Sequence, residues 1–294
     1  RSNTPEILVI LGDRFETMAV AQAAMSARIP IAHIHGGETT EGCIDEAIRH
    51  SITKMAHIHF ATTEVYAQRI RQMGENPNYV YNYGAPGIDN INKLNLLNKR
   101  ELSKSIDFEL HKKFIMVTYH PVTLLPDNGY RGLINLLTVL DKYPEYQLIF
   151  SYPNADRNNS DLRKLIEEYK EKNKTRVYLS RSLGKLKYLS ALKNCEMVVG
   201  NSSSGLIEAP SLGIPTVNIG DRQKGRVYGE TILNCNEDET EIESTINYAL
   251  SDEFKQKCKL AKNPYGKGQA SKSIIEKLIN LPLENLIFKK FFDV

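Results

Sequence analysis

Closely spaced cysteines, long apolar runs and strings of one charge are all scarce in this chain of 294 residues. Its four cysteines, Cys43, Cys195, Cys235 and Cys258, form no CxxC pair, which argues against a disulfide framework and favours reduced, structural thiols in a cytoplasmic protein. No segment approaches the roughly 18 apolar residues that span a bilayer, and no signal-peptide pattern opens the chain. The 38 basic and 35 acidic residues give a net charge of +3 without a basic run, so we expect neither a nucleic acid nor a membrane as partner.

Two common phosphate-binding signatures are also missing. The chain contains neither the GxxxxGK[ST] pattern of P-loop proteins nor the GxGxxG pattern of dinucleotide-binding proteins. An anionic ligand must therefore be bound by some other local arrangement. With 41% hydrophobic and 25% charged residues, the composition is that of an ordinary globular protein, and the length predicts two domains with a cleft between them.

Short apolar runs alternate with segments of helical periodicity along most of the chain. Residues 7–11 and 31–35 are typical of buried parallel strands, residues 15–27 of the helix between them, and the alternation resumes at residue 114 after the polar segment 90–113. This pattern predicts an α/β fold with two halves, residues 1–92 and 110–270, joined by a linker. We expect residues 271–294 to form a C-terminal helix that packs back on the first half. Because Arg1 is not an initiator methionine and a strand follows almost at once, we also expect an N-terminal piece to be missing.

Polar residues follow the first two predicted strands, where open α/β sheets bind ligands. Asp13 and Arg14 place a carboxylate beside a guanidinium, which suits an acid or base next to a phosphate clamp. A helix-capping aspartate beside a solvated arginine is the alternative. After the second strand, His33 and His35 share one face at period two, and Glu38 follows two glycines that permit close backbone approach.

The HxH spacing recurs at His57 and His59, which raises a metal site as an alternative. No further ligand type stands at helical spacing from this pair, so buried polar residues with satisfied hydrogen bonds are favoured, and we expect no metal. The next predicted helix opens with Asp45 and Glu46. Arg49 and His50 stand four residues beyond them, which stacks each acid beside a cationic partner, although acids in a first turn also simply complement the helix dipole.

The second half holds a strand, a loop of small residues and a helix between residues 198 and 208. Its loop offers hydroxyls and backbone N–H groups that suit a phosphate, from Ser202, Ser203 and Gly205. Glu208 lies one turn into the helix, within reach of a ribose, and Arg222 adds a cation downstream. A serine loop that only caps the helix is the alternative. His120 and Asn154 follow two further strands, in loops that on their own equally suit simple turns.

Together these motifs resemble the UDP-N-acetylglucosamine 2-epimerase family over nearly the whole chain. Arg14 and the pattern Asp45-Glu46-x-x-Arg49-His50 resemble its hydrolysing branch, which serves the synthesis of sialic acid and its relatives. The resemblance implies a glycosyltransferase-B-like fold, in which two Rossmann-like domains flank a cleft that holds the substrate. It also implies a homodimer and a reaction that needs no cofactor, neither metal nor nicotinamide.

Residue by residue, the resemblance implies that the second domain binds UDP. The matching positions are Ser202, Ser203, Gly205, Glu208 and Arg222, with Leu183 near the base and His120 and Asn154 near the diphosphate and sugar. Asp13 and Asp45 match acidic catalytic positions of the first domain. The implied reaction removes the C2 proton with loss of UDP, forms a glycal, and adds water with C2 inverted.

The chain departs from the family in two places. His35 stands where many members carry a catalytic glutamate, so either His35 or the nearby Glu38 is expected to supply the base. A histidine here resembles enzymes that make legionaminic-type sugars, which implies a UDP-2,4-diacetamido-trideoxy sugar as substrate. The family's first strand and its Gly/Arg loop are not in the sequence. A non-hydrolysing 2-epimerase, a glycosyltransferase of the same fold and a nucleotide-sugar-binding protein without turnover are the alternatives.

Overall fold

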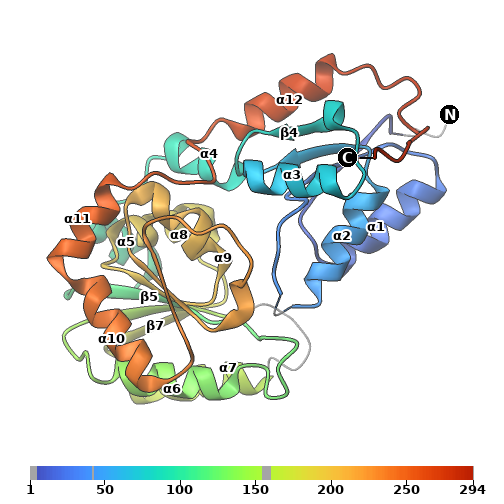
Figure 1. Ribbon diagram of the computed structural model, residues 1–294. Helices are drawn as coiled ribbons and strands as arrows, with labels where there is room; N and C mark the ends of the chain where they lie inside the picture. Colours follow the sequence, from blue (N-terminus) through green and yellow to red (C-terminus); the bar gives the residue numbers. More distant parts are fainter. Residues whose placement is uncertain (1–4, 42, 154–159, 294) are drawn as a thin grey trace.

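Two parallel sheets, each wound with helices, form two lobes joined by a short connection (Figure 1). The computed structural model describes residues 5–41, 43–153 and 160–293. The predicted α/β fold class with two halves is confirmed by these parallel sheets. No helix among the described residues is both long and apolar enough to cross a membrane.

The first lobe is built on a sheet of order β1-β2-β3-β4. Its strands are β1 (Leu8–Leu11), β2 (Ile31–Ile34), β3 (Ile58–Ala61) and β4 (Val80–Asn82). The helices α1 (Phe15–Ser26), α2 (Asp45–Met55) and α3 (Glu64–Gln72) and the short 3-10 turn Pro77–Tyr79 connect them. β2 and β3 are buried along their whole length. β1 differs from the prediction of a buried strand, because Val9 and Leu11 are exposed at the edge of the sheet. Asp13, His35 and the loop to Asp45 therefore follow strand ends at one edge of this sheet.

The second lobe is built on a sheet of order β10-β9-β8-β5-β6-β7. Its strands are β5 (Phe114–Thr118), β6 (Gln147–Ser151), β7 (Val177–Ser180), β8 (Val198–Gly200), β9 (Thr216–Ile219) and β10 (Ile232–Cys235). Its helices are α6 (Tyr130–Leu140), α7 (Ser160–Lys172), α8 (Gly184–Asn194), α9 (Ser203–Ile207), α10 (Glu239–Leu250) and α11 (Asp252–Leu260), with 3-10 turns at Ala209–Leu212 and Asp221–Gln223. The chain moves outward from β5 through β7 and then returns to β8 on the other side of β5, so the topological switch point lies between β5 and β8.

The predicted linker 90–113 is more ordered than its polar composition indicates. It contains the end of α4 (Pro86–Lys93) and all of α5 (Lys99–Ile106). Asn98 and Glu101 form a reciprocal capping box at the start of α5. Leu102 and Ile106 lie four residues apart on the buried face of α5, in one apolar cluster with residues of α8. Half of the predicted linker therefore belongs to helices, and α5 packs with the second lobe.

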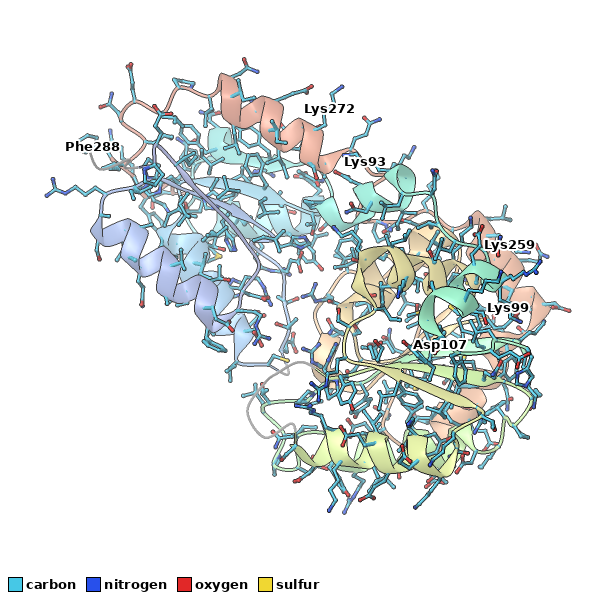
Figure 2. The ribbon with its side chains drawn as sticks, turned by 180° about the vertical axis from the view of Figure 1, so that it is seen from behind. Lys93, Lys99, Asp107, Lys259, Lys272 and Phe288 are labelled. Atoms are coloured by element: carbon cyan, nitrogen blue, oxygen red, sulfur yellow. The ribbon has the colours of Figure 1, made fainter. Side chains whose placement is uncertain are left out.

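The C-terminal segment crosses back from the second lobe to the first. In Figure 2, Lys259 lies on the second lobe, whereas Lys272 and Phe288 lie on the first. Helix α12 (Ala270–Asn280) contacts α4, and Ile274 and Leu286 join an apolar cluster with side chains of β2 and β3. The predicted helix over residues 271–294 is wrong beyond Asn280, because Pro282 has no backbone N–H to continue it. The remaining residues run irregularly along the first lobe.

Candidate active site

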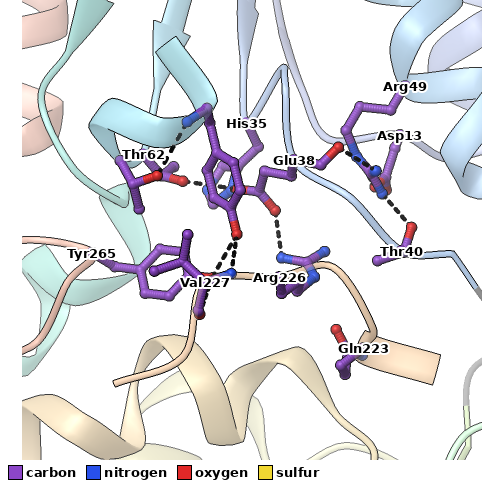
Figure 3. Close-up of polar contacts among 12 residues, drawn as sticks. Asp13, His35, Glu38, Thr40, Arg49, Thr62, Gln223, Arg226, Val227 and Tyr265 are labelled. Carbon is purple, nitrogen blue, oxygen red and sulfur yellow. Dashed lines mark hydrogen bonds and ion pairs between the residues drawn. The ribbon is translucent and has the colours of Figure 1, made fainter. Parts of the chain in front are cut away.

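A buried arginine organises the acidic residues of the first lobe. Arg49 on α2 is fully buried, and its Nε donates to Asp13 Oδ2 at 2.9 Å while Nη2 pairs with the same oxygen (Figure 3). Its Nη1 donates to Glu46 Oε2 at 2.7 Å and to the Glu38 carbonyl at 2.9 Å. A guanidinium presents donors in a fixed fork, so it sets the position and orientation of Asp13, which remains 23% exposed. Arg49 therefore acts on the site through Asp13.

Glu46 is held in the same network. It accepts hydrogen bonds from the backbone N–H of Thr40 at 2.5 Å and pairs with His50 Nε2 at 2.9 Å, as the four-residue spacing predicts. Burial opposes the charge on Glu46, but His50, the Thr40 N–H and Arg49 outweigh it and lower the pKa to about 2. Glu46 is therefore an ionised anchor for the loop before α2.

His35 and Glu38 form a buried pair at the end of β2. The imidazole Nδ1 of His35 lies 2.6 Å from Glu38 Oε1, and Thr62 Oγ1 donates to the same oxygen at 2.9 Å. The other oxygen of Glu38 pairs with Arg226 from the second lobe (Figure 3). Although burial opposes ionisation, Arg226 and His35 hold the pKa of Glu38 well below its usual range. Both carboxylate oxygens are thus engaged, which disfavours Glu38 as the alternative base.

The other histidines of the first lobe do not share the role of His35. His33 Nε2 donates to the Gly12 carbonyl at 2.9 Å, and burial lowers the pKa of His33 to about 4. His33 therefore supports the loop that carries Asp13, whereas His35 pairs with Glu38. His57 Nδ1 accepts from the Ile31 N–H at 3.2 Å, and His59 Nε2 lies 2.9 Å from Glu75.

A cavity of about 430 Å³ opens at the switch point of the second sheet, and we call it the switch cavity. His120 follows β5, and Ser202 and Ser204 follow β8. Leu183, Glu208 and Gly87 of α4 also line this cavity. At Gly200, which ends β8 with φ of +135°, a side chain would collide with the Thr118 carbonyl, so only glycine permits this approach of the two loops.

Two titratable groups that line the switch cavity have strongly shifted pKa values. Burial, reinforced by Arg222 and Arg14, lowers the pKa of His120 to about 3, so its imidazole is neutral at neutral pH. Its backbone N–H donates to Asn201 Oδ1 at 2.7 Å and its carbonyl accepts from Asn201 Nδ2 at 2.9 Å. Burial raises the pKa of Glu208 to about 7. Perturbed groups that converge on one cavity are typical of functional sites.

A smaller cavity of about 130 Å³ lies between the lobes, and we call it the interlobe cavity. From the first lobe it is lined by Asp13, Arg14, Thr40, Cys43, Asp45 and Arg49, and from the second by Ser203, Arg222, Gln223 and Arg226. The structure thus brings Asp13, Asp45, Ser203 and Arg222 together from sequence positions far apart. Carboxylates from the first lobe, together with guanidinium groups from both lobes, suit proton transfer beside an anionic leaving group.

Two predicted residues are not seen to contact the site. Gly205 lies in α9, directly after residues 201–202, which we call the switch loop. It is buried, and an added Cβ would lie 2.7 Å from Thr216 Cγ2, so its small size serves the packing of α9 on β9. Asn154 lies outside the described residues. Sequence reasoning missed Arg226, Thr62 and Asn201. Asn201 stood within the small-residue motif, whereas nothing in the local sequence separates Arg226 from other loop arginines.

The chain is similar to known proteins over nearly its whole length. The sequence profile described as UDP-N-acetylglucosamine 2-epimerase matches residues 1–279. A GDP/UDP-N,N'-diacetylbacillosamine 2-epimerase (hydrolyzing) of Campylobacter jejuni is 39% identical, over 99% of this chain and 75% of that relative. The polysialic acid biosynthesis protein P7 of Escherichia coli is 36% identical, over 100% and 75% respectively. The crystal structure of UDP-GlcNAc 2-epimerase from Neisseria meningitidis bound to UDP-GlcNAc superposes with a TM-score of 0.80 at 23% identity, covering 94% of this chain and 77% of that one.

The fold and the site define a two-lobed α/β protein of the glycosyltransferase-B-like class, with a cavity at the switch point of its second sheet. Within that class, the chain belongs to the UDP-N-acetylglucosamine 2-epimerase family. The resemblance inferred from the motifs is thereby confirmed.

Proposed function

We propose that this protein is a hydrolysing 2-epimerase, which converts a UDP-linked 2-acetamido sugar and water to UDP and the free sugar with C2 inverted. One observation carries the proposal: the interlobe cavity joins the carboxylates of Asp13 and Asp45 to Ser203 and Arg222. This is the arrangement that elimination of UDP across C1 and C2 requires. The hydrolysing relative from C. jejuni, at 39% identity, supports the same reaction.

UDP binds to the second lobe in this proposal. Leu183 lies near the base, Glu208 accepts hydrogen bonds from the ribose, and Ser202, Ser203 and the backbone around Gly205 bind the diphosphate. Arg14, Arg222 and the neutral His120 face the same diphosphate, with Asn154 assigned by family resemblance alone. Cationic and N–H groups aimed at a departing diphosphate typically lower the barrier by about 3–4 kcal/mol for each donor.

The chemical step takes place on the first-lobe side. A base removes the C2 proton while the bond from C1 to the UDP oxygen breaks, which leaves a glycal. Water then adds its hydroxyl at C1, and C2 receives a proton on the opposite face. Asp13 and Asp45, which line the interlobe cavity, exchange the protons together with His35 at the end of β2. Arg49 holds Asp13 in place, and Glu46 holds the loop before α2. A positioned acid or base contributes about 10² to 10⁴ in rate.

A UDP-2,4-diacetamido-trideoxy sugar is the preferred substrate in this proposal, with UDP-GlcNAc as the slower one. His35 and the relative named for diacetylbacillosamine both support it. Residues 1–92 and 110–270 serve as the two domains, with 271–294 returning to the first. We further propose that the protein works as a homodimer in the cytoplasm, where its four free thiols stay reduced.

Proton NMR of the reaction in D₂O tests the proposed function. With each of the two UDP-sugars, we expect free UDP and a free C2-epimerised sugar that carries deuterium at C2, since the proton returned to C2 comes from solvent. The faster substrate identifies the sugar class. Asp13→Asn is the control, and its turnover is expected to fall by about 10² to 10⁴ while UDP still binds.

Two results would contradict the proposal. A UDP-linked C2 epimer would assign the chain to the non-hydrolysing branch. UDP binding without turnover of either sugar would instead indicate a nucleotide-sugar-binding protein.

A further inference from the structure

Arg226 reaches from the second lobe into the first. It lies in the loop between β9 and β10, and its Nη1 pairs with Glu38 Oε2 in the loop after β2 (Figure 3). The side chains of Arg226 and Glu38 are only 8% and 2% exposed. Such a pair is screened little by solvent and depends on both lobes being in place. The ion pair is therefore a buried contact that joins the two lobes.

The backbone on either side of Arg226 is fixed to both lobes. The Val227 N–H donates to the Tyr66 hydroxyl of α3 at 2.7 Å, and the Tyr265 hydroxyl donates to the Val227 carbonyl at 2.9 Å. The two tyrosine oxygens lie 3.0 Å apart. Toward the second lobe, Gln223 Nε2 donates to the Asn201 carbonyl at 2.8 Å. These bonds hold Arg226 between the switch loop and the first sheet.

Because Arg226 fixes Glu38, the hydrogen bond to Glu38 also fixes His35. The ionised Glu38 accepts, so Nδ1 of His35 carries the proton of their 2.6 Å hydrogen bond. In the neutral ring Nε2 then bears the free lone pair, which is the form that a base requires. His35 also has φ of +70°, a left-handed backbone conformation that is uncommon for a residue with a side chain. Strained residues of this kind persist where the surroundings hold them.

We propose that Arg226 is a positioning residue that assembles the base across the lobe boundary. From the second lobe it fixes Glu38, which fixes the tautomer and orientation of His35 on the first. The inference rests on the proposed function, since it assigns His35 Nε2 to the C2 proton. His35 takes that proton and becomes an imidazolium, while Glu38 stays ionised beside it. Proton removal is thereby coupled to contact between the first lobe and the lobe that binds UDP.

Steady-state kinetics of charge-removing variants test the inference. We expect Arg226→Met and Glu38→Gln each to lower kcat about 10- to 100-fold, with KM within about threefold and UDP affinity unchanged. Exchange of the C2 proton falls in parallel. The double variant loses no more than the worse single variant, because the two residues act as one unit. Arg226→Lys restores part of the rate, since it keeps the charge but not the fork.

Lys224→Met is the matched control. Lys224 lies in the same loop and its Nζ is 3.9 Å from Glu41 of the first lobe, but both side chains are more than half exposed. Its removal is expected to leave kcat within about twofold, since exposed pairs contribute little. Loss of the buried Arg226–Glu38 pair should therefore lower kcat, whereas loss of the exposed Lys224–Glu41 pair should not.

A second measurement separates positioning from loss of stability. Arg226→Met leaves a buried carboxylate without its partner, whereas the double variant removes both charges together, so its melting temperature should recover while kcat stays low. In NMR of ¹⁵N-histidine-labelled protein, the Nδ1-bound proton of His35, assigned by its loss in His35→Gln, should shift in Glu38→Gln and Arg226→Met.

Three outcomes would overturn the inference: Arg226→Met with kcat within twofold of the parent protein, losses that multiply in the double variant, or kcat that recovers with the melting temperature. If the parent protein itself releases no UDP from either sugar, the proposed function fails, and the histidine NMR signal still tests whether Arg226 fixes His35 through Glu38.

Discussion

Glu208 combines a buried carboxyl group with a place in the wall of the switch cavity. Its Oε2 accepts no hydrogen bond from the described residues, and burial raises its pKa to about 7 although His35 and Arg226 oppose that shift. Gly87 leaves room for it, because an added Cβ would lie 2.8 Å from Glu208 Oε1. A buried acceptor of this kind is suited to hydroxyl donors of a ligand.

The raised pKa predicts how stability depends on pH. The folded protein holds the Glu208 proton more tightly than the unfolded chain does. This contribution is full below pH 4.5 and is lost as the pH rises through about 7. Relative to Glu208→Gln, the parent protein should therefore lose about 1–3 kcal/mol of its free energy of unfolding between pH 4.5 and 8. Thermal melts of both proteins across this range measure the difference.

Glu145→Gln is the control for the loss of one carboxyl group, since Glu145 is exposed. Its melting curve should follow that of the parent protein at every pH. Parallel curves for Glu208→Gln and the parent protein would show that burial does not raise the pKa of Glu208.

At the residue scale, sequence reasoning found the groups that follow strand ends. Asp13, His120 and Ser202 were predicted because parallel strands present their carboxyl ends at one edge of a sheet. Arg226 could not be found in this way. Its partner Glu38 is 188 positions away, and the contact depends on how one lobe sits against the other. A local pattern carries no information on such a pairing.

Helix α12 depends on another element for its N-terminal cap. Gln269 at its start makes no side-chain capping bond. Asp89 on α4 accepts from the Ala270 N–H at 3.0 Å and from the Ser271 N–H at 2.7 Å, and its side chain is buried. A carboxylate on the first N–H groups of a helix satisfies donors that the helix itself leaves unpaired. Asp89 thus connects the returning C-terminal segment to α4.

Replacing Asp89, which caps α12 from another element, should destabilise α12 in particular. We expect Asp89→Ala to lower the free energy of unfolding by about 1–2 kcal/mol and to speed amide hydrogen exchange in α12. Asp238→Ala is the matched control, because Asp238 caps α10 from within the same element through the Thr240 and Glu241 N–H groups. Its faster exchange should be confined to α10. Unchanged protection of α12 in Asp89→Ala would contradict the capping role.

At the element scale, the positions of the strands were predicted well, but the exposure of β1 and the helix α5 were not. The strand predicted over residues 31–35 is observed as Ile31–Ile34, and the helix predicted over residues 15–27 is observed as Phe15–Ser26. Helix α5 was predicted as linker because its charged residues and serines leave an amphipathic face of only Leu102 and Ile106. The helix after Ala270 was predicted too long, since hydropathy alone does not weigh Pro282.

The whole molecule is held together by the return of the chain to its first lobe. Lys289 donates to the carbonyls of Lys54 and Ala56, each at 2.6 Å, and pairs with Glu75 at 2.6 Å. Glu75 is 2% exposed and also pairs with Lys54 and His59. Burial opposes its charge, but His59, Lys289 and Lys54 together lower the pKa of Glu75 to about 2. Because Lys289 supplies one of the cations that stabilise the buried Glu75, the C-terminal segment is part of the structure of the first lobe.

Lys289→Met should therefore destabilise the first lobe. Loss of the charged hydrogen bonds around Glu75 is expected to cost about 2–3 kcal/mol of the free energy of unfolding. The neighbouring Lys290→Met, at an exposed position, is the control and should change it by less than about 0.5 kcal/mol. Denaturant unfolding of both variants measures the difference, and equal midpoints would show that Lys289 does not anchor the segment.

The same return sets an order for biosynthesis. The strands of the second lobe lie between residues 114 and 235, so that lobe can fold soon after they leave the ribosome. The first lobe begins earlier but waits for Ile274, Leu286 and Lys289, which emerge after the strands of the second lobe. Until then its sheet lacks part of its apolar cover and is open to chaperones. Of the two lobes, the one whose strands come earlier in the chain is therefore completed later.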